Sequence, residues 1–417
     1  MTPMRILYVI HQFYPEFRSG TEKFLLNLAS IIQRDGHFVE VMTYTFSESQ
    51  ERSRHNRNLL VHKYDYRGLP VTAVGHQTLP IDIHTSCENR EIYSFAQEYL
   101  GTGKRFDLVH FAHPMRLGSF ARAALESGIP YILTLTDYWM ICPKFFLRTS
   151  AGALCAGAEG GLACVKHCPE LDASFIKDRS ALARAMLFGA KSIISPSKFL
   201  AAIFQKEFPG LPVGIIPHGM NFKYLKSNSK KYHSGSKIVF AYCGGLSPHK
   251  GIHLLLKSFR DLDPQNAELR LYGSCFHEDA YLGYLKDIAN SDERIRFCGT
   301  YSEDQVGEAL SDIDVLVLPS LWYENYPLVL HEALACNVPV IASNIGGMAE
   351  KVMPSMNGFT FKAGDAKDLE ETLKFVLDSP DILNRIKQSM QSYIAPLAEE
   401  EAYLYERLYR TNTTCRA

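Results

Sequence analysis

Residues 320–336 read Ser320-Leu-Trp-Tyr-Glu324-Asn-Tyr-Pro327-Leu-Val-Leu-His331-Glu332-Ala-Leu-Ala-Cys336. They come almost directly after the apolar run Val315–Leu318, so we expect them at the C-terminal end of a sheet strand, where α/β proteins bind ligands. Pro327 suits the first turn of a helix. The N–H groups of Leu328 and Val329 would then point outward at the positive end of the helix dipole, a favourable place for a phosphate. The pattern predicts a helix N-terminus that binds an anionic ligand.

Two carboxylates flank this helix start. Glu332 lies five residues after Pro327, which is about 7.5 Å along a helix at ~1.5 Å per residue. That length suits the span from a diphosphate to a ribose, whose vicinal hydroxyls a carboxylate binds well. Glu324 precedes the helix and would face the other end of the ligand. The alternative is a surface loop with a solvated glutamate, but the surrounding stretch is apolar and favours a binding site.

Apolar runs of strand length alternate with helical patterns along the whole chain, which is typical of parallel sheets. Strands are expected at residues 5–10, 38–43, 108–111, 131–135, 192–194 and 214–216, and then at 238–243, 269–272, 294–297, 315–318 and 338–342. Helices are expected at residues 21–34, 252–260 and 399–409. The sequence therefore predicts an α/β fold with two Rossmann-like parallel-sheet domains that face a central cleft.

A polar, basic and Ser-rich stretch interrupts the alternation at residues 220–237, and we interpret it as an interdomain linker. The predicted organisation is a first domain of residues 1–220 with 398–417, a linker of residues 221–237 and a second domain of residues 238–397. The helix expected near the C-terminus would return to the first domain.

Composition excludes several classes of protein. The chain has 417 residues, 46% of them hydrophobic and 21% charged, with a formal net charge of −1, so a disordered chain, a coiled-coil rod and a dedicated nucleic-acid binder are not expected. No apolar run approaches the roughly 18 residues of a spanning helix. The N-terminus leads into a strand without a secretory signal, which predicts a cytoplasmic protein.

Taken together, the motifs resemble those of retaining glycosyltransferases of family 4, which have the GT-B fold. Glu324 and Glu332, with seven residues between them, match the E-x7-E motif of that family. Further segments that resemble family motifs are Pro15–Glu22, Asp107–His113, Ser195–Phe199, Ile216–Met220, Tyr242–Gly251, Ile341–Glu350 and Asn357–Phe359. The resemblance implies transfer of a sugar from a GDP- or UDP-linked donor to a glycan or lipid-linked acceptor, in polysaccharide or glycoconjugate synthesis. It implies no metal or other cofactor for the chemistry.

The resemblance also implies three catalytic residues: Glu324, His113 and Lys250. Lys250 opens a helix after a strand, so its ammonium can neutralise the leaving diphosphate; a solvated lysine is the alternative. His113 follows the strand ending at Phe111 and would contact the donor sugar, whereas a lone histidine beside a strand is otherwise more often structural. Glu324 would contact the transferred sugar, either as a nucleophile or as an electrostatic clamp.

The resemblance further implies a set of residues that bind the donor: Gly20, Gly245, Lys250, Tyr301, Leu328, Val329 and Glu332. Three positions depart from the family pattern, and one of them is Pro327, where many members have a glycine. Gly245 stands where many relatives have an arginine in a Gly-Arg-Leu triplet, and Thr136 stands before Asp137 where His-Asp is common. These departures leave open an alternative function, a non-catalytic subunit that binds sugar nucleotides.

Four cysteines lie close together in the sequence: Cys142, Cys155, Cys164 and Cys168. The segment around them is rich in Gly and Ala and has little to build a core, so it needs a staple or remains mobile. Four thiolates could hold a structural Zn²⁺ ion or an iron–sulfur cluster. Their spacing is not the usual C-x2-C pair, and a loop with reduced thiols is the alternative.

Two basic stretches could contact an anionic lipid surface that carries a lipid-linked acceptor. One comprises Arg52, Arg54, Arg57, Lys63 and Arg67, and the other is Lys144–Arg148. The alternative for both is a solvated basic face. Peripheral membrane association is therefore an open prediction, no nucleic-acid partner is expected, and the sequence does not indicate an oligomeric state.

Overall fold

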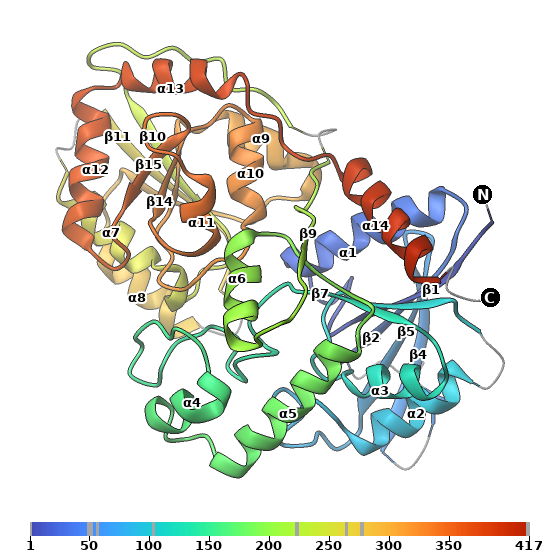
Figure 1. Ribbon diagram of the computed structural model, residues 1–417. Coiled ribbons are helices and arrows are strands. Elements are labelled where there is room, and N and C mark those ends of the chain that lie inside the picture. Colours follow the sequence, from blue (N-terminus) through green and yellow to red (C-terminus); the bar gives the residue numbers. More distant parts are fainter. Residues whose placement is uncertain are drawn as a thin grey trace. The chain divides into compact units, whose positions relative to one another are not determined.

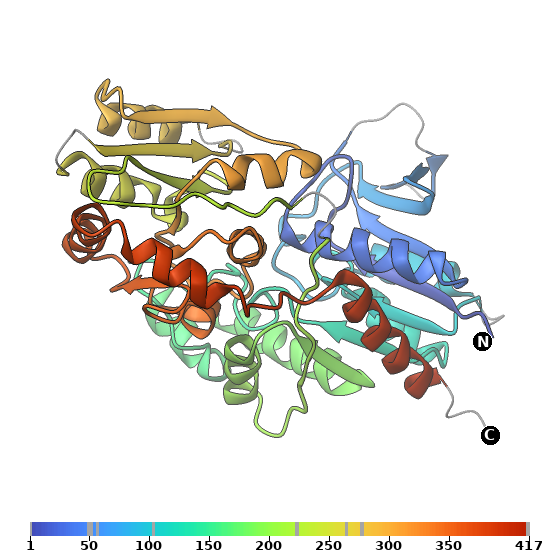
Figure 2. The ribbon, with the colours of Figure 1, turned by 90° about the horizontal axis from the view of Figure 1, so that it is seen from above.

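The computed structural model describes residues 2–47, 53–55, 58–101, 105–221, 225–262, 266–275 and 279–413. The chain divides into two compact units (Figure 1). Unit 1 comprises Met1–Gly219 and Ala398–Ala417, and unit 2 comprises Met220–Leu397. Each unit has its own β-sheet with helices around it (Figures 1 and 2). The predicted α/β class is confirmed, while the cleft between two facing domains stays a prediction.

The sheet of unit 1 has nine described strands in the order β3-β4-β5-β2-β1-β6-β7-β8-β9. Their bounds are β1 (Arg5–Ile10), β2 (Phe38–Tyr44), β3 (Ser53–Arg54), β4 (Leu59–Tyr66), β5 (Leu69–His76), β6 (Leu108–Phe111), β7 (Tyr131–Thr134), β8 (Ser192–Ser195) and β9 (Gly214–Ile215). From β5 to β9 all pairs are parallel, whereas β3, β4 and β5 pair in antiparallel fashion at one edge. The C-terminal ends of β1, β2 and β6 therefore meet at one edge of the sheet.

Helices pack on both faces of this sheet (Figure 1). Their bounds are α1 (Gly20–Arg34), α2 (Arg90–Leu100), α3 (Ser119–Glu126), α4 (Leu162–His167), α5 (Ala173–Gly189), α6 (Lys198–Glu207) and α14 (Ala398–Thr413). α1 and α14 share one apolar core with the sheet, and α14 is fixed by a buried polar chain. His110 contacts the Tyr409 hydroxyl through Nδ1 at 2.8 Å and the Thr134 hydroxyl through Nε2 at 2.7 Å. Burial lowers the pKa of His110 to about 3, so this histidine is a neutral core residue.

The sheet of unit 2 is wholly parallel, with the described strands in the order β12-β11-β10-β13-β14-β15. The strands are β10 (Ile238–Cys243), β11 (Ala267–Tyr272), β12 (Ile295–Gly299), β13 (Val315–Leu318), β14 (Val340–Ser343) and β15 (Gly358–Phe361). The helices are α7 (Ile252–Arg260), α8 (Asp279–Ala289), α9 (Val306–Ser311), α10 (Leu328–Ala335), α11 (Gly346–Lys351), α12 (Ala366–Asp378) and α13 (Ile382–Met390). Two apolar clusters draw on side chains from alternating positions of the strands. Because β10 and β13 are neighbours, the loops that follow them meet.

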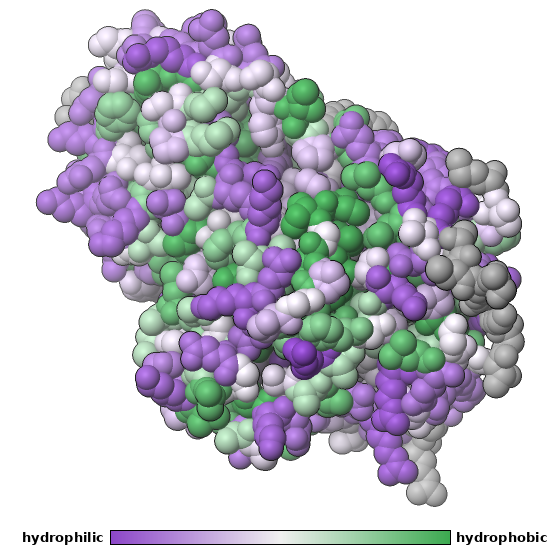
Figure 3. Space-filling model, viewed as in Figure 1, coloured by the Kyte–Doolittle hydropathy of each residue, from purple (hydrophilic) through white to green (hydrophobic). Residues whose placement is uncertain are grey.

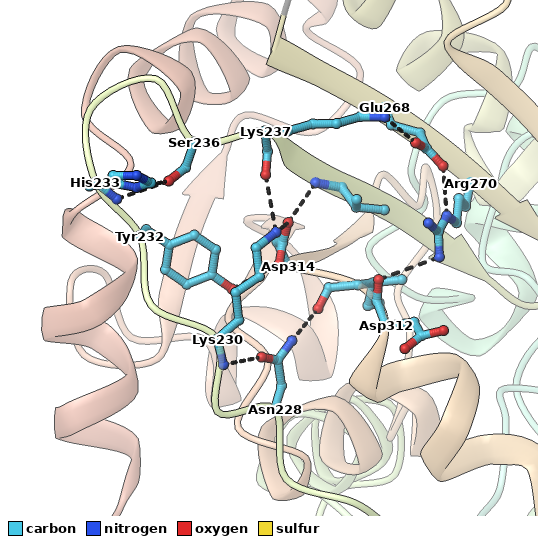
Figure 4. Close-up of polar contacts among 12 residues, drawn as sticks. Asn228, Lys230, Tyr232, His233, Ser236, Lys237, Glu268, Arg270, Asp312 and Asp314 are labelled. Atoms are coloured by element: carbon cyan, nitrogen blue, oxygen red, sulfur yellow. Dashed lines mark hydrogen bonds and ion pairs between the residues drawn. The ribbon is translucent and has the colours of Figure 1, made fainter.

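The stretch interpreted as a linker is attached to unit 2 over much of its length (Figure 4). Asp314, just before β13, accepts hydrogen bonds from Lys230 Nζ at 2.6 Å and from the Tyr232 hydroxyl at 2.9 Å. Lys237 Nζ lies 2.6 Å from Glu268 at the start of β11. Asn228 donates from Nδ2 to the Ile313 carbonyl at 2.6 Å. These contacts lie at the N-terminal ends of the strands, opposite the edge where ligands bind in such sheets.

Candidate active site

Lys250 and Glu324 form an ion pair at the C-terminal edge of the unit 2 sheet. Lys250 follows β10 and Glu324 follows β13, and their Nζ and Oε1 atoms are 2.7 Å apart. The two loops are joined by a hydrogen bond from the Leu321 N–H to the His249 carbonyl at 2.8 Å. Gly251 has φ +73°, and a Cβ there would lie 2.0 Å from the Pro319 carbonyl oxygen. A glycine at this position thus lets the lysine loop approach the end of β13.

The Glu324 carboxylate is held by two further donors. Its Oε1 atom also accepts hydrogen bonds from Ser320 Oγ at 2.7 Å and from Trp322 Nε1 at 2.8 Å. The residue is 6% exposed. Burial alone would raise the pKa of Glu324, but the charge of Lys250 and the three hydrogen bonds outweigh burial and lower it. The carboxylate is therefore an ionised, fixed group, and sequence reasoning did not identify Ser320 or Trp322 as its partners.

The predicted helix N-terminus is present, with one correction. Pro327 is the N-cap, with φ −68° and ψ 107°, and α10 begins at Leu328 rather than at the proline. Leu328 and Val329 are the first two helical residues, whose N–H groups have no acceptor within a helix. Glu332 points from the second turn and is 7% exposed.

Tyr301 and Glu332 belong to one neighbourhood in unit 2. The Tyr301 hydroxyl donates to the Cys243 thiol, and the charge of Glu332 acts on both groups. The Tyr301 ring also meets the Tyr272 ring edge-on, with 5.7 Å between centroids. Tyr301 follows β12 and Glu332 lies on α10, whereas Lys250 and Glu324 follow the neighbouring strands β10 and β13.

Gly245 lies in open space in the loop after β10. A Cβ at this position would meet nothing within 4 Å, and its φ lies outside the left-handed range. Its carbonyl accepts a hydrogen bond from the Tyr242 hydroxyl at 2.8 Å. A residue with a side chain would therefore be accepted at this position without backbone strain or a clash at Cβ.

The glycine loop of unit 1 leads into a buried carboxyl group. Gly20 is exposed and begins α1, and the Ser19 N–H before it donates to Glu22 Oε2 at 2.6 Å. Glu22 is completely buried, and burial raises its pKa although hydrogen bonds from Ser19 and Gln12 oppose the shift. Its other oxygen, Oε1, lies 3.9 Å from His11 Nε2. Sequence reasoning had singled out Gly20 and missed this pair.

His113 is 2% exposed, and both of its ring nitrogens contact the protein. Nδ1 accepts a hydrogen bond from the Met115 N–H at 3.2 Å, so the ring proton resides on Nε2, which faces Asp137 Oδ2 at 2.9 Å. The ring centroid lies 4.1 Å from that of His11. The Asp137 side chain is 24% exposed, so the aspartate is the more accessible member of the pair.

The four clustered thiols lie near one another. Cys142, Cys164 and Cys168 are buried, Cys155 is half-buried, and Cys164 experiences the charge of the other three. The Cys142 sulfur accepts hydrogen bonds from the N–H groups of Lys144 and Leu147. In the part of the chain that the structure describes, no group of three or more His, Cys, Asp or Glu side chains is arranged to hold a metal ion. A metal centre at these cysteines stays a prediction, and the present side-chain positions do not add to it.

The structure adds no support for lipid binding by the two basic stretches. Arg52 and Arg57 lie outside the described residues, as does the side chain of Arg54. Lys144 pairs with Glu170 at 2.8 Å. Hydrophilic and hydrophobic residues are interspersed over the face drawn in Figure 3. Among the described helices, none combines the length and the apolar character needed to cross a membrane.

Both halves of the chain match known protein families. Residues 18–224 match the family described as Glycosyltransferase Family 4, and residues 226–392 match Glycosyl transferases group 1. The chain belongs to glycosyltransferase family 4. The resemblance drawn from the motifs is thereby confirmed, and the two matched regions meet a few residues after the change from unit 1 to unit 2.

Among curated relatives, the family 4 chain is 30% identical over 183 residues to the lipopolysaccharide 1,2-N-acetylglucosaminetransferase of Salmonella typhimurium, which covers 40% of this chain and 48% of that protein. The chain spans about half the length of the curated relatives it matches. Its fold is similar to that of Anabaena HepE in complex with UDP-glucose, with a TM-score of 0.69, 18% identity and coverage of 98% and 100% of the two chains. WaaG, a glycosyltransferase involved in lipopolysaccharide biosynthesis, gives a TM-score of 0.66 at 15% identity, with coverage of 98% and 100%. These structural similarities confirm the GT-B fold.

Proposed function

We propose that this family 4 chain is a retaining glycosyltransferase that transfers a sugar from a nucleotide-diphosphate sugar to a glycan or lipid-linked acceptor. The observation that carries the proposal is the ion pair between Lys250 and Glu324 at the C-terminal edge of a parallel sheet, next to the start of α10. Unit 2 would bind the donor and unit 1 the acceptor. Among donors we favour UDP-sugars over GDP-sugars, because the structurally similar HepE is described in complex with UDP-glucose.

The charges around the donor site suit departure of a diphosphate. The Lys250 ammonium would stabilise the negative charge that develops as the glycosidic bond breaks, and the first N–H groups of α10 would add their dipoles. Glu332, on the second turn, would accept hydrogen bonds from the ribose hydroxyls, with Tyr301 near the base. Gly20 at the start of α1 would let the backbone approach the donor closely. No metal ion is assigned to this chemistry.

The surroundings of Glu324 favour the role of a clamp over that of a nucleophile. Three donors bind its Oε1 atom, and they stabilise the carboxylate in its ionised form. Such stabilisation lowers the reactivity of an oxygen towards carbon. Oε2 is then the atom that would accept a hydrogen bond from the transferred sugar.

A comparison of wild type with Glu324→Gln tests the proposal. The glutamine keeps the size of the side chain but removes the charge opposite Lys250, and we expect turnover of UDP-sugars, measured as UDP release, to fall at least 100-fold. Glu399→Gln, on an exposed side chain of α14, is the matched control and should retain activity. Equal background turnover in wild type and Glu324→Gln, together with binding of UDP, would instead favour the second candidate, a non-catalytic subunit that binds sugar nucleotides. The Gly245 and Thr136 departures are the observations behind that candidate.

We further propose that the protein acts in surface polysaccharide or glycoconjugate synthesis in the cytoplasm, with its acceptor presented at the inner face of a membrane. The similarity to lipopolysaccharide glycosyltransferases supports this proposal. Co-sedimentation with anionic vesicles, compared with neutral vesicles, tests the membrane part. Equal recovery of the protein in both pellets would contradict a contact through basic side chains.

A further inference from the structure

A buried arginine stands at the ligand-binding edge of unit 1. Arg116 lies in the segment between β6 and α3 and is 8% exposed. Its Nε atom donates to His84 Nδ1 at 3.1 Å, and Nη1 donates to the His11 carbonyl at 2.7 Å. The guanidinium also lies over the Phe46 ring, 4.8 Å from the centroid. These contacts fix it near the C-terminal ends of β1 and β2, where His11 and Phe46 lie.

Within the described ranges of the chain, the positive charge of Arg116 has no direct counter-ion. Among the residues that the structure describes, no carboxylate lies within 4 Å of its guanidinium. Glu16 and Glu22 act on the charge only from a greater distance. A guanidinium has five N–H donors, and two of them are used, so one on Nη1 and both on Nη2 have no partner in the described part of the chain. Burying a charge in this way is costly unless it is paired.

A second buried arginine in the same unit shows the contrast. Arg179 is 3% exposed, and each of its three nitrogens donates to a backbone carbonyl: Nε to Thr85, Nη1 to Met140 and Nη2 to Trp139. This is the pattern of an arginine that only joins loops. Arg116 also joins loops, through His11 and His84, but leaves one edge of its fork open.

The backbone at Arg116 gives a further reason to look for a ligand. Its φ is +68°, a left-handed conformation that is uncommon for a residue with a side chain. Such conformations persist where the surroundings enforce them, and they cluster at binding sites. The buried Nδ1 atom of His11 and Oε1 atom of Glu22, in the same neighbourhood, also have no hydrogen-bond partner. Several polar atoms at this edge are thus available at once.

We propose that Arg116 is an anion-binding residue, and that the free edge of its guanidinium takes a phosphate or carboxylate group of a substrate. The planar fork matches both groups with two parallel hydrogen bonds. The group can come from two sources, an anionic sugar in the acceptor or the diphosphate of the donor. The assignment rests on the proposed function because it names the chemistry of a substrate.

Binding of matched sugars tests the assignment. Wild type, with saturating UDP to occupy the donor phosphate site, is titrated by calorimetry with glucose 6-phosphate, glucuronate and glucose. If the anion belongs to the acceptor, the two anionic sugars bind at least tenfold more tightly than glucose, and Arg116→Met abolishes the difference. If it belongs to the donor, Arg116→Met instead weakens UDP binding at least tenfold. Arg179→Met is the matched control, because it removes a buried arginine whose three nitrogens all donate to backbone carbonyls, and it should change neither quantity more than twofold.

The wild-type protein alone can overturn the acceptor assignment, even where a variant fails to fold. Equal binding of the charged and uncharged sugars by wild type, with unchanged UDP binding in a folded Arg116→Met or Arg116→Lys protein, would exclude an anion at Arg116. Hydrolysis of UDP-sugars without acceptor is followed in the same samples. Its absence in wild type counts against the proposed function, whereas an active enzyme that treats the three sugars alike loses only the anion site.

Discussion

Trp322 Nε1 lies 2.8 Å from Glu324 Oε1, and the Lys250 ammonium stands 5.0 Å from the centre of the Trp322 ring. The indole therefore contacts both members of the ion pair, one as a hydrogen-bond donor and the other through its π face. Three donors bind the same carboxylate oxygen, Oε1. The indole N–H therefore helps to fix the orientation of the carboxylate and with it the position of Oε2.

Trp322→Phe should lower the turnover of donor while the chain stays folded. Phenylalanine keeps an aromatic face for Lys250 but removes the N–H donor to a charged group, a bond worth about 1.5–3 kcal/mol. Two donors remain, so we expect the stabilisation of the transition state to fall by ~1.4 kcal/mol, which lowers kcat about tenfold. The KM for the donor should change less. Steady-state kinetics of Trp322→Phe provide the measurement. Ser320→Ala, which removes a different hydrogen-bond donor to Glu324, is measured beside it. A kcat equal to that of wild type would show that the indole only fills space.

Gly245→Arg should strengthen donor binding. The position is open and its φ suits any residue. A new charge-assisted bond to phosphate is worth about 1 kcal/mol at a partly exposed site, or roughly a fivefold lower Kd for UDP. Calorimetry with UDP gives the answer, and Gly245→Ala, which adds only a Cβ in empty space, should bind as wild type does. Weaker binding by the arginine variant would mean that the loop contacts the nucleotide through its backbone.

The periodicity of the sequence was sufficient for most of the parallel strands and for the helices α1, α7 and α14. β1, β6, β10 and β13 begin and end where the apolar runs do, because strands that are buried on both faces need unbroken apolar stretches. The hairpin of β4 and β5 was not predicted, although Lys63 and Asp65 alternate with less polar residues along β4, which is the pattern of a strand with one buried face. β15 was missed because Gly358–Phe361 is short and begins with a glycine.

The site was predictable where a motif places the chemistry in one loop, and not where tertiary contacts assemble it. Glu324 and Lys250 were identified from their loops, although 74 residues separate them. No sequence motif pointed to Arg116, because its surroundings are formed by His84 and His11. Both are distant from it in the sequence and follow no common spacing. The hydrogen bond between Trp322 and Glu324 could not be predicted either, because it depends on the shape of the turn after β13. That shape depends in turn on the close approach of the loop at Gly251.

Reactivity of the thiols should follow burial. Burial raises the pKa of Cys142, and it raises that of Cys164 to about 12, with the other thiols adding to the shift. At pH 7.5 few of these groups are thiolates, which are the reactive form. We expect N-ethylmaleimide to label Cys298, which is exposed, and Cys155 before Cys142 and Cys164, as read by mass spectrometry of peptides. Labelling of Cys155 in native protein without a chelator would contradict a metal centre, whereas labelling of all four only after a chelator is added would establish one.

Stability should depend on pH through Lys387. This lysine of α13 is 3% exposed, and its Nζ atom lies 2.9 Å from Asn228 Oδ1 and 2.8 Å from the Tyr232 hydroxyl. Burial lowers the pKa of Lys387 to about 8, with Asp314 opposing the shift and Lys230 adding to it. Between pH 8 and the ordinary lysine value near 10.4, the unfolded chain holds more protons than the folded one at this residue. The free energy of unfolding should therefore rise with pH across that interval, and below pH 8 this group should contribute no slope.

Lys387→Met isolates this contribution. The variant leaves the Asn228 and Lys230 carbonyls with one donor fewer, which lowers its stability by about 1–3 kcal/mol. At pH 7 the removal of a buried ammonium opposes this cost, so the variant should be least stable relative to wild type near pH 10. Its dependence on pH from 8 to 10 should be flatter than that of wild type. Urea unfolding at pH 7, 8, 9 and 10 measures both effects, with Lys257→Met on α7, an exposed lysine, as the control that should keep the wild-type slope. Parallel curves for wild type and Lys387→Met would mean that the lysine keeps an ordinary pKa and that Asp314 neutralises it in the folded chain.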